Sequence, residues 1–210
     1  MTEDWLGRWR EGRTGWHEKH GNALLKRHWP KLAAGSRVLV PLCGKAPDLL
    51  WLAARDLNVI GVEISDIAVR AFFDESGLEF TRAAGNGLDR YTAADASIDI
   101  YCGDYFAFET SPCDALYDRG AIVAIEKTHR AEYVAHTKRL LKPDAARLLI
   151  TLEYDQSVVD GPPYAVLAEE IRGYWDDLER VAERDDLETC PPKFRKAGLQ
   201  EIREVAWLGR

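Results

Sequence analysis

The sequence has little that would place the protein in a membrane or outside the cell. None of its 210 residues lies in an apolar run as long as the ~18 residues of a membrane-spanning helix. It begins Met-Thr-Glu-Asp-Trp, which is polar and acidic, so we expect no secretory signal. The four cysteines include no Cys-x-x-Cys pair and lie far apart, at Cys43, Cys102, Cys113 and Cys190. We therefore expect reduced thiols, a cytoplasmic location and no association with membranes.

An excess of positive charge is missing as well. The chain has 28 Lys and Arg against 35 Asp and Glu, a net charge of -7. Because nucleic-acid binding depends on clustered Lys and Arg, we expect no nucleic-acid partner. The histidines lack the spacing of a metal site, so we expect no metal; they are His17, His20, His28, His129 and His136. The length suits one α/β domain over residues 1–210, which we expect to be a monomer.

Glycine is scarce where a dinucleotide-binding turn would need it. Residues 37–41 predict a strand, 49–53 a helix and 58–63 a second strand, which together form a βαβ unit. The turn after the first strand holds Gly44 where a dinucleotide motif has three glycines, so we expect no pyrophosphate there. Glu63 ends the second strand nineteen residues after Gly44, the position from which a carboxylate binds ribose hydroxyls. The unit predicts a nucleoside site.

Strands and helices alternate through the rest of the chain. We expect helices over residues 66–76, 128–141 and 168–178, and strands over 78–82, 97–102, 114–118, 147–154, 179–184 and 200–207. Residues 83–96 show little periodicity and are expected to be a loop, alone or with a short strand in it. The pattern predicts an α/β fold with a doubly wound, mostly parallel sheet and helices on both faces. Residues 35–210 would form this core, and 1–34 a mostly helical N-terminal cover.

Chemically useful residues follow the ends of several predicted strands, where ligands bind in such sheets. Asp104 either caps a turn or accepts the amine of an adenine whose ring packs on Tyr105. Arg119 either pairs with an acid (Asp118, Glu153 or Asp155) or faces a cofactor carboxylate or an anionic substrate. Cys43 has no neighbouring base in the sequence and is not expected to be a nucleophile.

The first two tryptophans of the N-terminal segment suggest a surface that covers something. Trp5 and Trp9 are four residues apart, so they share one face of a helix. That face either packs on the core or forms an aromatic lid over a ligand. The two interpretations remain open from the spacing alone.

At these residues the chain resembles the thiopurine S-methyltransferase family, a branch of the class I S-adenosylmethionine-dependent methyltransferases. The resemblance extends over most of the chain and rests on Trp5–His17, Pro41–Lys45, Gly61–Glu63, Tyr117–Ala124, Thr151–Gln156 and Gly161–Pro163. The Pro-Leu-Cys-Gly-Lys turn is far more specific than a glycine-rich loop.

The resemblance implies a Rossmann-like, seven-stranded sheet with one antiparallel strand and bound S-adenosylmethionine, which becomes S-adenosylhomocysteine. By position, the residues it assigns to the cofactor are Trp5, Trp9, Leu42, Gly44, Glu63, Asp104, Tyr105 and Arg119. Arg119 is also the implied catalytic residue, near both cofactor and substrate. The residues assigned to the acceptor are Trp16, Pro162 and Pro163.

The activity that the resemblance implies is an S-methyltransferase for an aromatic or heterocyclic thiol, of the thiopurine kind. Its methyl group would move by in-line displacement, which needs alignment and exclusion of water more than a strong base. The alternatives are methylation of small anions (halide, thiocyanate, or selenium and tellurium species) and a non-catalytic cofactor-binding module. A nucleotide-dependent oxidoreductase is a further rival, against which the missing glycines count.

Overall fold

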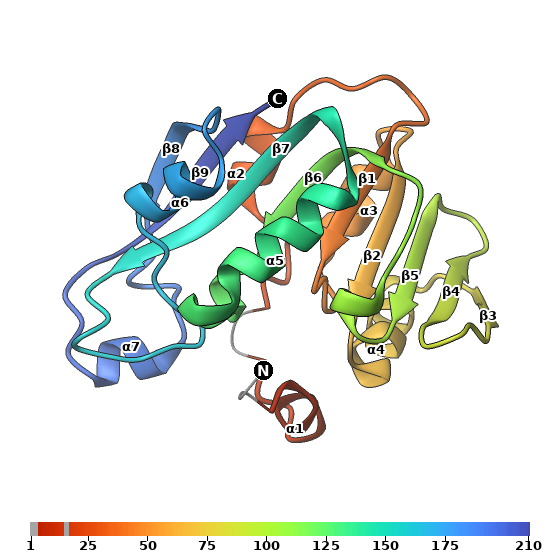
Figure 1. Ribbon diagram of the computed structural model, residues 1–210. Coiled ribbons are helices and arrows are strands. Elements are labelled where there is room, and N and C mark those ends of the chain that lie inside the picture. The colour runs from red at the N-terminus through yellow and green to blue at the C-terminus, as the bar shows by residue number, and fades with distance from the viewer. Residues whose placement is uncertain (1–3, 15–16) are drawn as a thin grey trace.

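The computed structural model describes residues 4–14 and 17–210. Within them the chain forms a nine-stranded sheet in the order β3-β4-β5-β2-β1-β6-β7-β9-β8, flanked by helices (Figure 1). The strands are β1 (Arg37–Pro41), β2 (Asn58–Glu63), β3 (Phe80–Ala83), β4 (Asp89–Ala93), β5 (Ile98–Cys102), β6 (Cys113–Arg119), β7 (Leu141–Tyr154), β8 (Glu179–Asp185) and β9 (Ile202–Gly209).

The centre of the sheet is parallel and its two sides are antiparallel. Strands β5, β2, β1, β6 and β7 run in one direction. Antiparallel pairing adds β4 and β3 on one side, and β9 and β8 on the other. The predicted α/β class with a parallel centre is confirmed. The expectations of seven strands and of one antiparallel strand are wrong, because the sheet has nine strands and both β4 and β9 run antiparallel to the centre. Residues 89–93 form β4 in the segment where we expected a loop or a short strand.

Helices cover both faces of the sheet. They are α1 (Trp5–Arg10), α2 (Ala23–His28), α3 (Asp48–Ala53), α4 (Asp66–Ser76), α5 (Lys127–Arg139), α6 (Ala168–Tyr174) and α7 (Pro192–Lys196), with 3-10 turns η1 (Tyr105–Ala107) and η2 (Ile122–Ala124). Local chemistry sets both ends of α4: Ser65 caps its first turn, and Gly77, with a φ of 69°, ends the helix.

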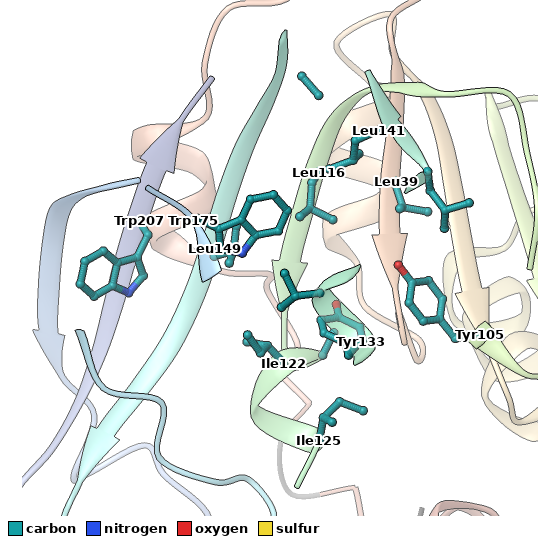
Figure 2. Close-up of a cluster of buried hydrophobic side chains, with 14 of the residues drawn as sticks. Leu39, Tyr105, Leu116, Ile122, Ile125, Tyr133, Leu141, Leu149, Trp175 and Trp207 are labelled. Carbon is teal, nitrogen blue, oxygen red and sulfur yellow. The ribbon is translucent and has the colours of Figure 1, made fainter. Parts of the chain in front are cut away.

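Each face of the sheet has its own hydrophobic core. Tyr133 of α5 and Ile171 of α6 pack with Leu39, Leu116 and other inward side chains on one face. Figure 2 shows this cluster, in which the side chains of three neighbouring strands meet Tyr133 and Trp175. On the other face, α2, α3 and α4 bury a second cluster that includes Leu25, Leu49, Leu52, Phe72 and Phe73. Burial of this apolar surface holds the helices against the sheet.

Three further expectations need correction. The N-terminal cover is less helical than predicted, since its described residues form two helices of 6 residues each. Strand β7 starts at Leu141, six residues before the predicted strand, because it continues outward to pair with Cys113. Helix α6 ends at Tyr174 and not at residue 178. No helix among the described residues is long and apolar enough to cross a membrane.

The strand order fixes where a ligand can bind. In the sheet, β2 and β5 lie on one side of β1, and β6 and β7 lie on the other side. The chain completes the first side before it crosses to β6. Such a switch point opens a crevice at the carboxyl ends of the two central strands. In Figure 1 these ends point toward α1, which lies beyond them.

Candidate active site

A cavity of about 260 Å³ lies at the carboxyl ends of the central strands. Strands β1, β2, β5 and β6 contribute residues at or just beyond their ends, and α1 contributes Trp5 and Trp9. Side chains of β7, β8 and β9 extend the cavity away from the nucleoside-type βαβ unit. The cavity therefore has two ends: one at Glu63 and the turn after β1, and the other at Arg119 and β8.

The turn after β1 brings backbone close to the cavity. Leu42 and Gly44 both have positive φ values, 48° and 55°, which turn the chain sharply away from the sheet. A Cβ atom on Gly44 would lie 3.3 Å from the Trp9 ring. The missing side chain thus lets Trp9, which is only 8% exposed, pack directly over the turn.

Glu63 is held by backbone donors at the end of β2. Its Oε2 accepts from the Gly44 N–H at 2.9 Å, and its Oε1 accepts from the Ser65 N–H at 2.9 Å. Burial raises the pKa of Glu63 to about 6, although these backbone hydrogen bonds pull in the opposite direction. Each carboxylate oxygen has a second lone-pair site, so both can still accept a ligand hydroxyl.

The loop after β5 gives the cavity an aromatic wall. Tyr105 and Phe106 line it, together with the backbone of Gly103. The Tyr105 hydroxyl bonds Thr137 at 2.9 Å, and its ring packs edge-on against His136. Asp104 is exposed, accepts from the Phe106 N–H at 3.0 Å and is not among the lining residues. The structure thus shows the capping contact of Asp104 and does not bring it into the cavity.

The other end of the cavity carries paired charges. Arg119 Nη2 lies 2.9 Å from Glu18 Oε1, and Arg184 Nη2 lies 3.0 Å from the same oxygen. Arg184 also pairs with Glu204, its register partner across β8 and β9, with 2.5 Å between Nε and Oε2. Burial lowers the pKa of Arg119 while Glu18 and the neighbouring acids raise it, and the balance is upward. Arg119 pairs here with Glu18 and not with the nearby acids that the sequence suggested.

The remaining predicted residues divide between the cavity and its surroundings. Pro163 lines the cavity, whereas Pro162 is buried outside its lining and accepts from Lys193 through its carbonyl. Trp16 lies outside the described residues. Cys43 lines the cavity, but burial, followed by the nearby Glu63, raises the pKa of its thiol well above the usual range, which opposes a nucleophilic role.

A family comparison identifies the relationship. The profile described as Thiopurine S-methyltransferase (TPMT) matches residues 1–210. This chain belongs to the thiopurine S-methyltransferase family. The resemblance predicted from the sequence is confirmed, and with it the methyltransferase class.

Thiopurine S-methyltransferases from two bacteria are similar over nearly the whole length. That of Photobacterium profundum is 42% identical over 210 residues, which cover 99% of this chain and 97% of the relative. That of Bordetella petrii is 44% identical over 214 residues, which cover 98% of this chain and 96% of the relative.

A solved structure shares the fold. The 1,6-didemethyltoxoflavin-N1-methyltransferase of Burkholderia thailandensis, solved with S-adenosylhomocysteine, matches with a TM-score of 0.62 and 17% identity, covering 98% of this chain and 85% of that one. The predicted Rossmann-like methyltransferase fold is confirmed, and the predicted cofactor is the one associated with this family and fold.

The cavity of this thiopurine S-methyltransferase family member fits that cofactor. Its Glu63 end offers a buried carboxylate to a ribose, and the Gly44 turn allows close approach of a ligand because it has no side chain. Tryptophan faces from α1 lie at the same cavity and suit a sulfonium. Among the described residues there is no cluster of three or more His, Cys, Asp or Glu that could hold a metal ion.

The cavity residues that the sequence did not point to include Glu18, Arg184 and Glu204. Glu18 and Arg184 are 166 residues apart in sequence and neither falls in a recognisable motif. Only the register of β8 against β9 brings Arg184 to the carboxyl edge of the sheet opposite Glu204. Alternating charges in residues 179–185 were the available signal, and they are equally typical of an exposed edge strand.

Proposed function

We propose that this protein is an S-adenosylmethionine-dependent S-methyltransferase that methylates the sulfur of an aromatic or heterocyclic thiol. The observation that carries the proposal is one cavity that joins a nucleoside-type end at Glu63 to an arginine-bearing end at Arg119. Family membership supports the reaction class, and the thiopurine S-methyltransferase names of the relatives support sulfur as the acceptor.

The bound cofactor would supply an electrophilic methyl group on a positively charged sulfur. Glu63 would bind the ribose through its fixed carboxylate, and Leu42 and Gly44 would border the methionine part. Tyr105 would pack beside the adenine. Trp5 and Trp9 would cover the ligand from α1 and place aromatic rings near the sulfonium.

The rate of methyl transfer to a thiol depends more on the alignment of the reacting atoms than on the strength of an acid or base in the protein. The nucleophilic sulfur must approach the methyl carbon in line with the bond that breaks. Trp9 packs over the Gly44 turn, which limits the entry of water from the α1 side. Arg119 would orient the acceptor from the opposite end of the cavity.

The walls of the acceptor end favour an organic acceptor over a small hydrated ion. Ile150 and Leu152 of β7, Val123 of η2 and Pro163 contribute apolar surface there. Such surface favours the rings of an aromatic or heterocyclic thiol, because their transfer out of water is favourable. A halide or oxyanion would lose hydration at these walls, and the guanidinium groups of Arg119 and Arg184 at this end already pair with Glu18.

The test is methyl transfer from labelled S-adenosylmethionine to a panel of acceptors. The panel holds thiophenols, mercaptopurine-type thiols, alkyl thiols, iodide, thiocyanate, selenite and tellurite. We expect transfer to the aromatic and heterocyclic thiols, with kcat/KM at least tenfold above that for any inorganic anion. Transfer mainly to the anions would instead support small-anion methylation, and tight cofactor binding without any transfer would support a binding module.

A further inference from the structure

The charged end of the cavity is organised around a single carboxylate oxygen. Glu18 Oε1 accepts from Arg119 at 2.9 Å, from Arg184 at 3.0 Å and from Asn22 Nδ2 at 3.4 Å. Asn22 also bonds Glu204, which pairs with Arg184. We call these five residues the Glu18 cluster. Four of them line the cavity; Asn22 lies buried behind.

The second carboxylate oxygen of Glu18, Oε2, differs from Oε1 in its hydrogen bonding. Every hydrogen bond from a described residue to the Glu18 side chain ends on Oε1, and none reaches Oε2. The Glu18 side chain keeps 27% of its surface exposed and lines the cavity. One oxygen is therefore fixed by cations, while the other accepts no hydrogen bond from the described residues and belongs to a side chain that lines the cavity.

The other glutamates at the cavity cannot act in this way. Glu204 is 3% exposed, with Oε1 bonded to Asn22 and Oε2 paired with Arg184. Both oxygens of Glu63 accept backbone N–H groups at the cofactor end. Oε2 of Glu204 accepts no hydrogen bond from the described part of the chain either, but it is buried. Of the described glutamates that line the cavity, Glu18 alone combines a fixed orientation and a partly exposed side chain with an oxygen that accepts no hydrogen bond from the described residues.

We propose that Glu18 is the catalytic proton acceptor for a thiol that binds in its neutral, protonated form. Arg184 acts as a positioning residue that, with Arg119, holds the carboxylate toward the cavity. This inference rests on the proposed function and narrows its substrate class: the acceptor is a thiol delivered with its proton, and not a preformed anion.

The charges and atoms of this step balance. The thiol sulfur forms a bond to the methyl carbon as the bond from that carbon to the sulfonium breaks, and the electron pair of the broken bond stays on the departing sulfur. The S–H proton passes to Glu18 Oε2. A cationic cofactor, a neutral thiol and a carboxylate become two neutral thioethers and a carboxylic acid, which then releases its proton to water. General-base transfer of this kind contributes about 10² to 10⁴ in rate.

The charges around Glu18 also oppose an anionic acceptor. Its cationic neighbours are Arg119 and Arg184. The acids nearby are Glu204 within the cluster, Asp48 from α3 and Asp186 from the segment after β8. Next to it in the chain, His17 has its pKa lowered by burial, then by Lys45, so it adds no positive charge near neutral pH. An anion would have to displace Glu18 from the guanidinium groups or meet its carboxylate directly, and both are costly.

The experiment compares Glu18→Gln with Glu132→Gln, which removes the same charge from an exposed position on α5. Glutamine keeps an oxygen for the guanidinium groups but is not basic. With thiols whose pKa lies above the assay pH, we expect Glu18→Gln to lower kcat by roughly 100-fold or more. With thiols ionised at that pH we expect a loss below threefold, and raising the pH above the thiol pKa should restore the rate. Glu132→Gln should match the wild type throughout.

A binding measurement gives a readout that does not depend on turnover. The S-adenosylhomocysteine complex is titrated with an aromatic thiol whose thiolate absorbs in the near ultraviolet, and with thiocyanate. Wild type should bind the protonated thiol, whereas Glu18→Gln should bind the thiolate. The affinity of Glu18→Gln for thiocyanate should be at least tenfold higher than that of wild type. As a second variant, Arg184→Lys keeps the charge but loses the planar contact; it should show a smaller kcat loss with the same dependence on thiol pKa.

The outcomes separate this inference from the proposed function. If wild type methylates thiols but Glu18→Gln loses the same factor for every thiol at every pH, or loses nothing, the proton-acceptor role is wrong and the proposed function stands. If wild type transfers methyl to no thiol, the proposed function itself is wrong. A bound thiolate in the wild-type complex would also overturn the inference.

Discussion

The backbone N–H of Gly44 donates a 2.9 Å hydrogen bond to Glu63 Oε2. This contact ties the turn after β1 to the last residue of β2, and the Ser65 N–H fixes the second oxygen. The carboxylate is therefore oriented before any ligand binds, so ribose binding carries no free-energy cost for ordering this side chain. Under the proposed function the βαβ unit would be a preformed half of the cofactor site, and several consequences of that arrangement can be measured.

The pH dependence of cofactor binding should follow Glu63. Burial raises its pKa to about 6 from the usual 4.5, so the folded protein holds this proton more tightly than the unfolded chain does, and the site's contribution to stability falls as pH rises through this range. Ribose hydroxyls donate to the carboxylate form, and affinity for S-adenosylhomocysteine should therefore drop roughly tenfold between pH 7.5 and pH 5. Calorimetry across this range measures it.

Glu63→Gln is the control for that profile. Its affinity should be weak at every pH and nearly constant from pH 5 to 7.5, because the amide does not titrate. A variant that keeps the wild-type slope would assign the pH dependence to another buried group, such as Asp118, whose pKa burial also raises to about 6.

The local sequence predicted the βαβ unit that brings Gly44 and Glu63 together. Strand β1, the turn, α3 and β2 are contiguous, and their order alone places Gly44 beside Glu63. The acceptor end was not predictable in the same way, because Glu18 and Arg184 meet only through the pairing of β8 with β9. Strand β4 was expected only as an alternative to a loop for a related reason: it is short, and its pairing with β5 stabilises a strand that its weak sequence pattern does not specify.

Trp9→Ala should weaken cofactor binding while the fold persists. Trp9 packs over the Gly44 turn and lines the cavity, so its loss opens the site to water and removes an aromatic face from the sulfonium. A cation–π contact of about 1–2 kcal/mol corresponds to a roughly 5- to 30-fold loss of S-adenosylmethionine affinity. Calorimetry measures this loss, and circular dichroism checks the fold.

Trp51→Ala is the matched control for that variant, because Trp51 lies on α3 outside the cavity lining and stacks with Arg55. It should leave the affinity unchanged. Unchanged affinity in Trp9→Ala would remove α1 from the cofactor site.

Gly44→Ala should disturb both the turn and the tryptophan above it. The residue has a φ of 55°, which costs a side-chain-bearing residue about 1 kcal/mol, and the new Cβ would come within 3.3 Å of Trp9. We expect a lower melting temperature and at least a tenfold loss of S-adenosylhomocysteine affinity. Gly77→Ala, at a similar φ of 69° with no atom within 4 Å, should lower the melting temperature without changing affinity. Equal affinity losses in the two variants would contradict the close approach at Gly44.

Asn22 should be the residue that fastens the N-terminal segment to the core. It is fully buried, its Oδ1 caps α2 through the Leu24 and Leu25 N–H groups, and its Nδ2 donates to Glu204 at 2.9 Å. Asn22→Ala loses the cap and leaves a buried carboxylate with one donor fewer, so we expect a loss of about 2–4 kcal/mol in urea denaturation. The exposed Asn58, changed to alanine, should cost less than about 1 kcal/mol.

Asn22→Asp distinguishes the cap from the contact with Glu204. Aspartate caps a helix as well as asparagine does, so a stability set by the cap alone would be retained. Its carboxylate would, however, face Glu204 in a buried site, where like charges repel strongly. Because burial already raises the pKa of Glu204, acid should relieve the repulsion by protonating the pair. We therefore expect Asn22→Asp to be less stable than Asn22→Ala at pH 8 and to recover toward pH 5; the reverse order at pH 8 would show that the cap dominates.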